Sequence, residues 1–107
     1  MTQFTVVRLP QNNHSHKKYK IIISNGNTRR SVNIGDNRYE DYTQHKDDER
    51  KERYIARHQS RENWGASGMG TAGFWSRWLL WNKPSLRDSV DDIERRFGIT
   101  YAARLYG

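Results

Sequence analysis

The sequence predicts a single small α+β domain, in which a small N-terminal antiparallel three-stranded sheet is followed by three helices. Three observations favour this class. Short β-branched runs separated by turn residues fill the first third of the chain. Helix-capping residues and apolar residues spaced by three or four come after them. The length of 107 residues suits one domain and is short for two. The predicted parts are a basic β-rich part (1–37), a charged helical segment (38–64), a Gly-rich loop (65–73), and a Trp-rich helix with a C-terminal helix and tail (74–107).

The predicted strands are residues 4–9, 17–24 and 28–34. The middle strand contains a run of three isoleucines, which is typical of a strand. Asn25-Gly26 follows it directly, and this pair is a strong hairpin signal because both residue types tolerate positive φ. We therefore expect the three strands to form an antiparallel meander.

A charged helix is predicted to begin at Asp47 and to end near residues 62–64. Acidic residues come first and basic residues later, which suits the helix dipole, and Asp47 with Lys51 and Glu49 with Arg53 are spaced for ion pairs. The apolar stripe of this helix is narrow, which indicates a surface helix or one that bridges two packed bodies. The Gly-rich loop after it lacks the Lys-Ser/Thr ending of a phosphate-binding loop.

Three of the four tryptophans lie in a short predicted helix that Pro84 ends. Trp75, Trp78 and Trp81 recur at every third residue, and each step of three turns the side chain by about 60° around a helix. One core cannot easily take all three rings. We therefore expect at least one of them in the core and at least one at a contact with another chain.

The C-terminal helix has the strongest local signals in the chain. Ser85 is a suitable N-cap and Gly98 a suitable C-terminal cap. The residues between them include a single-face apolar stripe of Leu86, Val90, Ile93 and Phe97. The tail after Gly98 is expected to add a strand or to wrap a neighbouring chain.

The composition predicts a thin core. Hydrophobic residues make up 34% of the chain, and the mean hydropathy is −1.11, so the fold is expected to gain stability from a partner. Cysteine is absent, which excludes disulfides and thiolate zinc sites. No apolar run reaches the roughly 20 residues of a membrane span, and the N-terminus lacks the pattern of a signal peptide. We expect a soluble intracellular protein with no transmembrane segment.

The charge favours acidic partners. The chain carries a net charge of +7, and seven Lys/Arg against two Asp/Glu in residues 1–40 supply most of it. A hairpin would bring five cations together as a candidate nucleic-acid surface: Lys17, Lys18, Lys20, Arg29 and Arg30. The alternative interpretation is an ordinary solvated sheet edge, because lysines also prevent strands from pairing edge to edge.

Catalytic motifs are missing, so the sequence predicts no enzyme, no cofactor, no metal site and no small-molecule substrate. No nucleophile elbow is present. His45 and His58 lack the spacing of a helical zinc pair, although a metal-dependent enzyme that uses them stays an open alternative. His14-Ser15-His16 has no carboxylate or thiol support for binding a metal.

The segment from about residue 38 to 97 resembles a small family of large double-stranded DNA viruses of algae and amoebae, the nucleocytoplasmic large DNA viruses. The resemblance is carried by Asp41-Tyr42-Thr43, His45-Lys46-Asp47, Glu49-Arg50-Lys51, Arg53-Tyr54-Ile55, Arg57-His58, Glu62-Asn63-Trp64, Ser67-Gly68, Thr71-Ala72-Gly73-Phe74-Trp75-Ser76 and Trp78-Leu79-Leu80-Trp81-Asn82-Lys83-Pro84-Ser85-Leu86. The strands show no comparable likeness. The resemblance implies a viral product and a virion component, and it supplies no catalytic residue.

We therefore expect a non-enzymatic structural component of a large DNA virus particle, made in the host cytoplasm and located in the virion. In this role it is a minor capsid protein that cements neighbouring capsid proteins. The expected partner-binding residues are Phe74, Trp75, Trp78, Trp81 and Tyr106. The alternative is a basic nucleic-acid-binding protein that uses the N-terminal hairpin.

Overall fold

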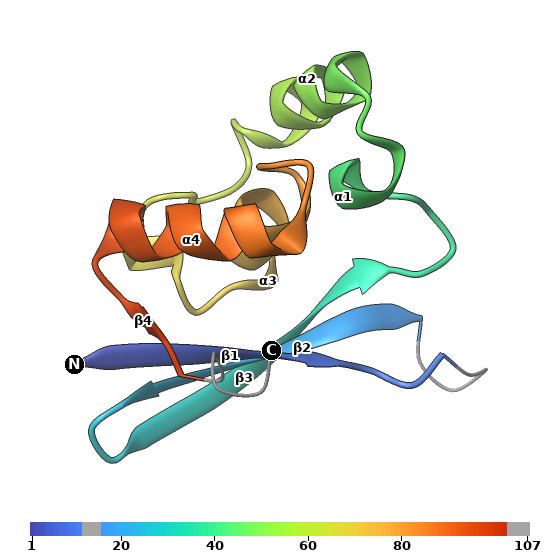
Figure 1. Cartoon of the computed structure of the whole chain (residues 1–107). Coiled ribbons are helices and arrows are strands. Elements are labelled where there is room, and N and C mark those ends of the chain that lie inside the picture. Colours follow the sequence, from blue (N-terminus) through green and yellow to red (C-terminus); the bar gives the residue numbers. More distant parts are fainter. Residues whose placement is uncertain (12–15, 103–107) are drawn as a thin grey trace.

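The chain folds into one sheet with all its helices on one face, as the α+β class predicts (Figure 1). The computed structural model describes residues 1–11 and 16–102. The strands are β1 (Thr2–Arg8), β2 (Lys17–Asn25), β3 (Thr28–Asp36) and β4 (Thr100–Tyr101). The helices are α1 (Tyr42–His45), α2 (Asp48–His58), the 3₁₀ turn η1 (Ala66–Gly68), α3 (Ala72–Trp75), the π-helical turn η2 (Ser76–Leu80) and α4 (Leu86–Phe97).

The sheet has the strand order β3-β2-β1-β4. The predicted antiparallel meander is confirmed for the first three strands, but the sheet is mixed, because β4 pairs in parallel with β1. The hairpin turn also differs from the prediction. Asn25 still pairs with Thr28, so the two loop residues are Gly26 and Asn27, and only Gly26 has a positive φ, of 63°. Glycine at the first loop position supplies the backbone conformation that this turn needs.

The region before the Gly-rich loop differs in two places from the prediction. A four-residue helix, α1, precedes the charged helix, and Asp41 caps it by accepting hydrogen bonds from the backbone N–H and the hydroxyl of Thr43. The charged helix begins after Asp47, as predicted, but α2 ends at His58 and so is shorter than expected. Glu49 and Arg53 form the predicted ion pair at 3.9 Å, whereas Lys51 donates to the carbonyl of Asn82 at 2.6 Å.

The tryptophan segment is not a regular α-helix. Trp81 N–H donates to the carbonyl of Ser76, five residues back, at 3.1 Å, which is the π-helical pattern. The segment then stops before Pro84 and leads into α4. The capping of α4 follows the prediction, since the hydroxyl of Ser85 accepts from Asp88 N–H at 3.1 Å and Gly98 has a φ of 66°.

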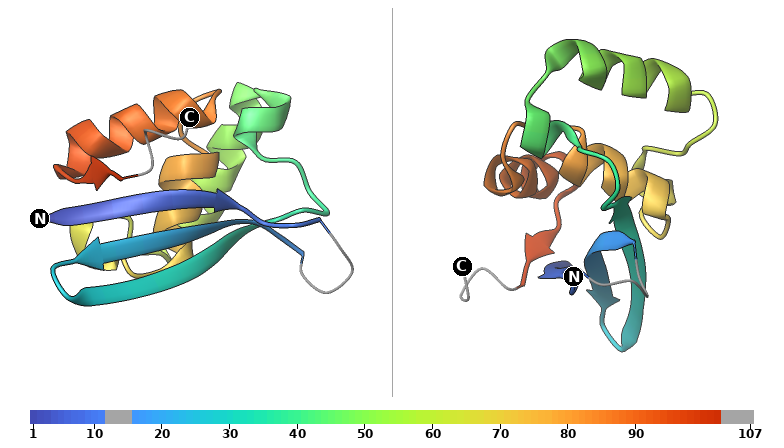
Figure 2. Two further views of the ribbon diagram at one scale, coloured as in Figure 1. Left: turned by 60° about the horizontal axis from the view of Figure 1, so that its bottom comes forward. Right: turned by 90° about the vertical axis from the view of Figure 1, so that its right-hand side faces the viewer.

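The core lies between the sheet and the layer formed by α3, η2 and α4. Side chains from the helix-facing side of the sheet meet the apolar sides of these helices, and the buried cluster consists of Phe4, Tyr19, Ile21, Ile23, Ile34, Phe74, Trp75, Trp78, Leu79, Leu80, Val90, Ile93 and Ile99. On the opposite face of the sheet, no described helix crosses the three long strands (Figure 2, left). The sheet is therefore covered on one face only, as in many antiparallel sheets.

Candidate functional site

Three of the predicted partner-binding residues belong to the core. Phe74 and Trp75 are fully buried and Trp78 is 9% exposed, although no partner chain is present. Their polar atoms are also satisfied internally: Trp75 Nε1 donates to the carbonyl of Met69 at 2.7 Å, and Trp78 Nε1 donates to the carbonyl of Trp64 at 2.8 Å. These three rings pack against the chain's own residues and leave little surface for a partner, so their binding to another chain stays a prediction. The sheet packs against one side of the tryptophan segment, and α4 packs against an adjacent side. Successive rings of the segment are therefore buried against two different parts of the fold.

Trp81 lies at a seam within the chain. Its ring is half-buried and stacks on Tyr54 of α2, with centroids 4.4 Å apart and an angle of 1° between the ring planes. His58 stacks on Tyr54 at 4.4 Å, and His45 lies 5.3 Å from Trp81. This aromatic column attaches α2 to the rest of the fold. The core part of our expectation for the tryptophans is confirmed by Trp75, whereas a contact of Trp81 with another chain stays a prediction.

The last predicted partner residue, Tyr106, lies outside the described residues, and so does His14. The two described helix histidines serve the aromatic column. His45 Nδ1 accepts from Asp47 N–H at 3.0 Å, and burial lowers the pKa of His45, with Arg50 acting in the same direction. Within residues 1–11 and 16–102, no group of three or more His, Asp or Glu side chains is arranged to hold a metal ion.

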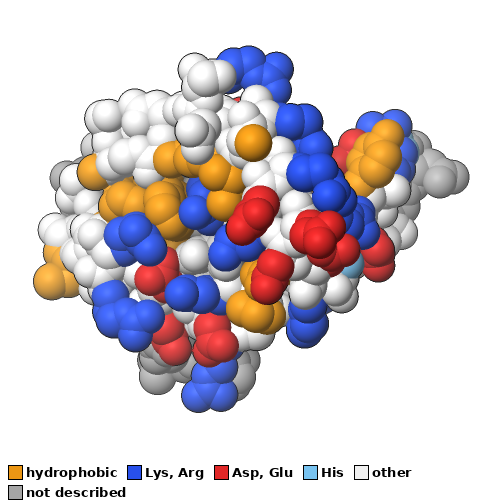
Figure 3. Space-filling view, turned by 90° about the horizontal axis from the view of Figure 1, so that it is seen from above, with side chains coloured by type: hydrophobic (Ala, Val, Ile, Leu, Met, Phe, Trp, Pro, Cys, Tyr) orange, Lys and Arg blue, Asp and Glu red, His pale blue; other side chains and the backbone are white. Residues whose placement is uncertain are grey.

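Cations surround the aromatic residues on the helix side. The Arg77 guanidinium lies 4.4 Å from the ring centre of Trp78 and 5.4 Å from that of Trp64, and Arg96 lies 4.2 Å above Trp78. Burial lowers the pKa of Arg77. Arg96 also pairs with Asp92 at 3.2 Å. Seen from above the helices, Lys and Arg side chains are interspersed with Asp and Glu, so this face has no broad patch of one charge (Figure 3).

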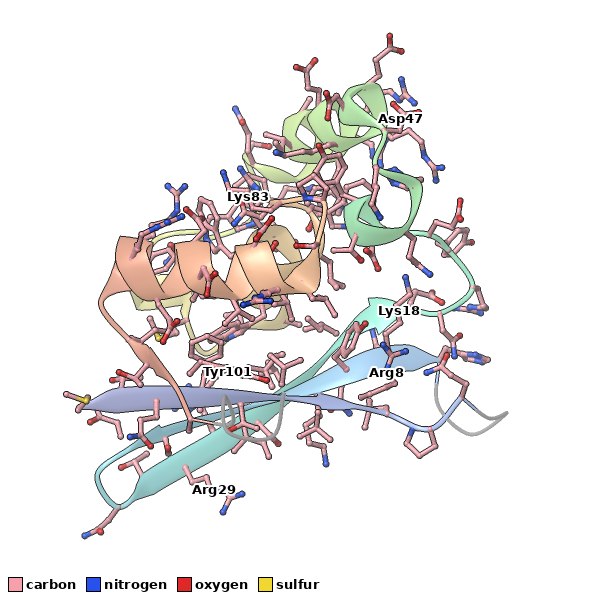
Figure 4. The ribbon with its side chains drawn as sticks, viewed as in Figure 1. Arg8, Lys18, Arg29, Asp47, Lys83 and Tyr101 are labelled. Atoms are coloured by element: carbon pink, nitrogen blue, oxygen red, sulfur yellow. The ribbon has the colours of Figure 1, made fainter. Side chains whose placement is uncertain are left out.

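The five hairpin cations do not form one surface. Lys18 lies on the helix side and Arg29 on the opposite side of the sheet (Figure 4). Strand alternation and the pairing of Ser24 with Arg29 place Lys20 on the same side as Arg29. The guanidinium of Arg30 lies against Gly70, and Lys17 is exposed at the start of β2. The predicted cluster is thus divided. Strand alternation separates Arg29 from Arg30. Lys18 and Lys20 have the same parity in β2, but the ammonium group of Lys18 is bound by Asp41 and Gln44 on the helix side.

Lys18 is the hairpin cation with the most defined structural role. Its ammonium group lies 2.7 Å from the Asp41 carboxylate and 2.6 Å from Gln44 Oε1, and the side chains of Lys18 and Asp41 are only 11% and 5% exposed. Gln44 Oε1 also accepts from Asp41 N–H at 3.0 Å. This network fixes α1 against β2. It removes Lys18 from any surface that could bind a nucleic acid.

A groove between β1 and α4 is a candidate binding site in the described part of the chain. It has a volume of about 720 Å³. Its lining is apolar, with two arginines and no carboxylate: Val6, Arg8, Tyr19, Leu79, Leu86, Arg87, Val90 and Tyr101. Arg8 and Tyr101 lie along it on the helix side of the sheet (Figure 4). A second hollow of about 560 Å³ shares Arg8, Tyr19 and Leu86 with it and reaches Lys46.

Sequence reasoning missed this groove. Val6 and Arg8 are two apart in β1, and this spacing showed only that they share a face. Leu86 and Val90 were assigned to the buried stripe of α4, and Arg87 received no role. The groove depends on where β4 joins the sheet, and a two-residue parallel strand leaves almost no local signal.

Comparison with known proteins gives one partial match. A model of a family of unknown function (DUF5754) matches residues 7–58, just under half of the chain. This stretch runs from the end of β1 through the hairpin to the end of α2, and it leaves out the tryptophan segment and α4. No curated protein and no solved structure matches the chain. No helix of the described residues is long and apolar enough to cross a membrane. The chain is thus similar, over its N-terminal half, to a family whose description states no function.

Proposed function

We propose that this protein is a non-enzymatic structural component of a large DNA virus particle, a minor capsid protein that binds neighbouring capsid proteins. The observation that carries the binding role is the β1–α4 groove, an apolar hollow that lies beside a strand edge without a described partner. Such an edge is a ready template for a strand of another protein. The viral setting is supported by the sequence resemblance over residues 38–97.

Quantitative mass spectrometry of purified particles, with chemical cross-linking of lysines, tests this proposal. We expect the protein in the particle fraction at a low copy number, with cross-links to other capsid proteins from lysines near the groove, such as Lys46. The control is the same measurement on infected-cell lysate after the particles are removed. Detection in that lysate alone would contradict the virion assignment.

A second candidate function is nucleic-acid binding by the uncovered face of the sheet. One observation favours it: this face carries two cations and no carboxylate. By strand alternation its residues are Gln3, Thr5, Val7, Lys20, Ile22, Ser24, Arg29, Ser31 and Asn33. A phosphate backbone would contact Lys20 and Arg29. Binding would weaken as the salt concentration rises, because the release of counterions from the nucleic acid then contributes less free energy.

A gel shift with double-stranded DNA at low salt tests this second candidate. The double variant Lys20→Ala/Arg29→Ala should weaken the shift and reduce the salt dependence by about two phosphate contacts. The matched control, Arg57→Ala/Arg61→Ala, removes the same charge from the exposed side of α2 and the residues after it. Equal effects of the two double variants, or no shift at all, would exclude a specific role for the sheet face.

A further inference from the structure

The outer edge of β1 is paired at its beginning and open beyond it. β4 pairs with β1 at Gln3 and Phe4, and Ala102 N–H donates to the carbonyl of Phe4 at 2.8 Å. Leu9 N–H donates in the opposite direction, to the carbonyl of Lys18 in β2, at 2.9 Å. Because successive residues of a strand direct their backbone groups to alternate sides, Val6 and Arg8 face the same edge as Phe4. Among the described residues, no strand pairs with β1 along this part of the edge.

The open edge runs directly beside the apolar groove. Val6 supplies the strand side of the groove, Leu79 lies at its base, and Val90 lies on the α4 side. Leu79 is fully buried and Val90 is 7% exposed, so the base of the groove is part of the core and is preformed. A strand added at this edge would place every second side chain over the groove.

The chemistry of the groove favours an acidic occupant. Arg8 and Arg87 both line it, and both are exposed. In the described ranges, no carboxylate forms an ion pair with either guanidinium. Asp41 lines the adjoining hollow, but it is only 3% exposed and is bound by Lys18. Arg8 lies 5.6 Å from the ring centre of Tyr19, and this contact leaves its charge without an acidic partner. A carboxylate that enters beside an apolar side chain would therefore meet two cations that lack a described carboxylate partner.

We propose that the β1–α4 groove binds an extended acidic segment of a partner protein, which adds to the sheet in line with β4. Its main chain pairs with Val6 and Arg8. One apolar side chain enters the groove between Val6 and Val90, and an acidic side chain two residues away reaches Arg8 and Arg87. This inference rests on the proposed protein-binding role and specifies the partner as a strand with an apolar-x-acidic pattern.

Two fluorescent peptides with blocked ends, Thr-Ile-Thr-Glu-Thr and its reversed order Thr-Glu-Thr-Ile-Thr, serve as probes for either strand direction. We expect saturable binding of at least one peptide by fluorescence anisotropy, with NMR shifts concentrated at the amides of Val6 and Arg8 and the methyl groups of Leu86 and Val90. Replacing Glu by Lys in that peptide should weaken binding by about tenfold or more, because attraction becomes repulsion. Failure of both peptides to bind would overturn the proposal.

Charge reversal in the protein tests the position of the acid. Arg8→Glu should lose the Glu-containing peptide and bind the Lys-containing peptide. Arg29→Glu, the matched control on the opposite face of the sheet, should keep the original preference. Equal behaviour of the two variants would show only nonspecific charge attraction and would overturn the assignment of the groove.

Methylated peptides test the strand pairing itself. In an added strand, alternate amides face β1. One test peptide is N-methylated at both Ile and Glu, and a second is N-methylated at the central Thr. One of these two peptides should lose binding and the other should keep it. Equal effects would contradict strand addition.

A chain that ends at Ala102 controls for competition by residues 103–107, and peptide binding by this shorter chain alone would overturn a partner in trans. Capsid cross-links that survive Arg8→Glu would reject the groove while leaving the proposed virion role intact.

Discussion

The tryptophan segment and the outer edge of β1 differ in how much of each is left free to bind a partner. The tryptophan segment is rich in aromatic residues, yet Trp75 is fully buried and the indole nitrogens of Trp75 and Trp78 are bonded within the chain. The β1 edge is unremarkable in composition, yet Val6 and Arg8 have backbone groups with no described strand partner. Backbone groups without a described strand partner beside an apolar groove are therefore the basis of our proposed docking surface, in place of aromatic density.

Trp75→Ala should have the largest effect on stability, because this ring packs against Phe4 and Phe74 with centroids 5.1 Å from each. We expect a loss of about 3–5 kcal/mol in the free energy of unfolding, enough to unfold much of the protein. Urea denaturation followed by circular dichroism measures this loss. If the segment were a docking surface, the substitution would leave the free chain stable and weaken only its assembly.

Breaking the Lys18–Asp41 pair should have the next largest effect. Lys18→Met leaves the nearly buried Asp41 carboxylate without its counterion and should cost about 3 kcal/mol. The double variant Lys18→Met/Asp41→Asn should recover part of this loss, because no uncompensated charge remains. A double-mutant cycle by urea denaturation measures the coupling. Independent, additive losses would show that the pair does not connect α1 to the sheet.

Trp81→Ala should lower the free energy of unfolding by about 2 kcal/mol, less than Trp75→Ala, because Trp81 is only half-buried. Its stacking partner Tyr54 belongs to the peripheral helix α2. The damage should be local, with amide exchange accelerated throughout α2 while the protection of α4 is kept. Hydrogen exchange by NMR distinguishes these elements. Equal acceleration in α2 and α4 would mean that Trp81 belongs to the same cooperative core as Trp75.

Acid should weaken the aromatic column through His45. Its folded-state pKa lies below the ordinary value of 6.5, so the unfolded chain binds the proton more readily. The contribution of His45 to the free energy of unfolding is therefore fully present above about pH 6.5 and is lost as the pH decreases toward the folded-state pKa. Protonation of Nδ1 would also remove the hydrogen bond from Asp47 N–H. Asp47, Glu40 and Asp41 oppose the lowering of the pKa, which keeps the effect small.

The variant His45→Asn keeps a hydrogen-bond acceptor near the place of Nδ1 and does not titrate. Its thermal unfolding midpoint should fall less than that of the wild type between about pH 7.5 and about pH 5. The difference between the two proteins, measured by differential scanning calorimetry, isolates the contribution of His45. Parallel pH profiles would contradict it.

The parts of the fold that were predicted correctly are those with local signals. Gly26 positioned the hairpin turn to within one residue, and Ser85 and Gly98 fixed the ends of α4. The rest depends on contacts between distant residues. β4 is identified only by its pairing with Gln3 and Phe4, and α1 is held by Lys18 from another element. Short elements of this kind carry too few residues for a periodic pattern.

The candidate site was harder to predict than the fold. The stacking of Trp81 on Tyr54 joins residues far apart in the sequence, so their spacing gave no sign of it. The division of the hairpin cations follows from strand alternation, but Lys18 leaves the expected surface because Asp41 and Gln44 bind it. The β1–α4 groove exists because a parallel strand stops after two residues, which only the assembled sheet shows.

Amide hydrogen exchange along β1 in the free protein tests the central claim most directly, namely that the chain buries Trp75 and Trp78 without a partner and that the described residues leave part of the β1 edge unpaired. We expect alternating protection, with Thr5 and Val7, which face β2, exchanging slowly and Val6 and Arg8 exchanging quickly. The amides of Leu79 and Ile93 in the core should be the most protected. Uniform protection along β1 would show that the edge is already filled. Weak protection of Leu79 and Ile93 would show that the tryptophan core needs a partner to form.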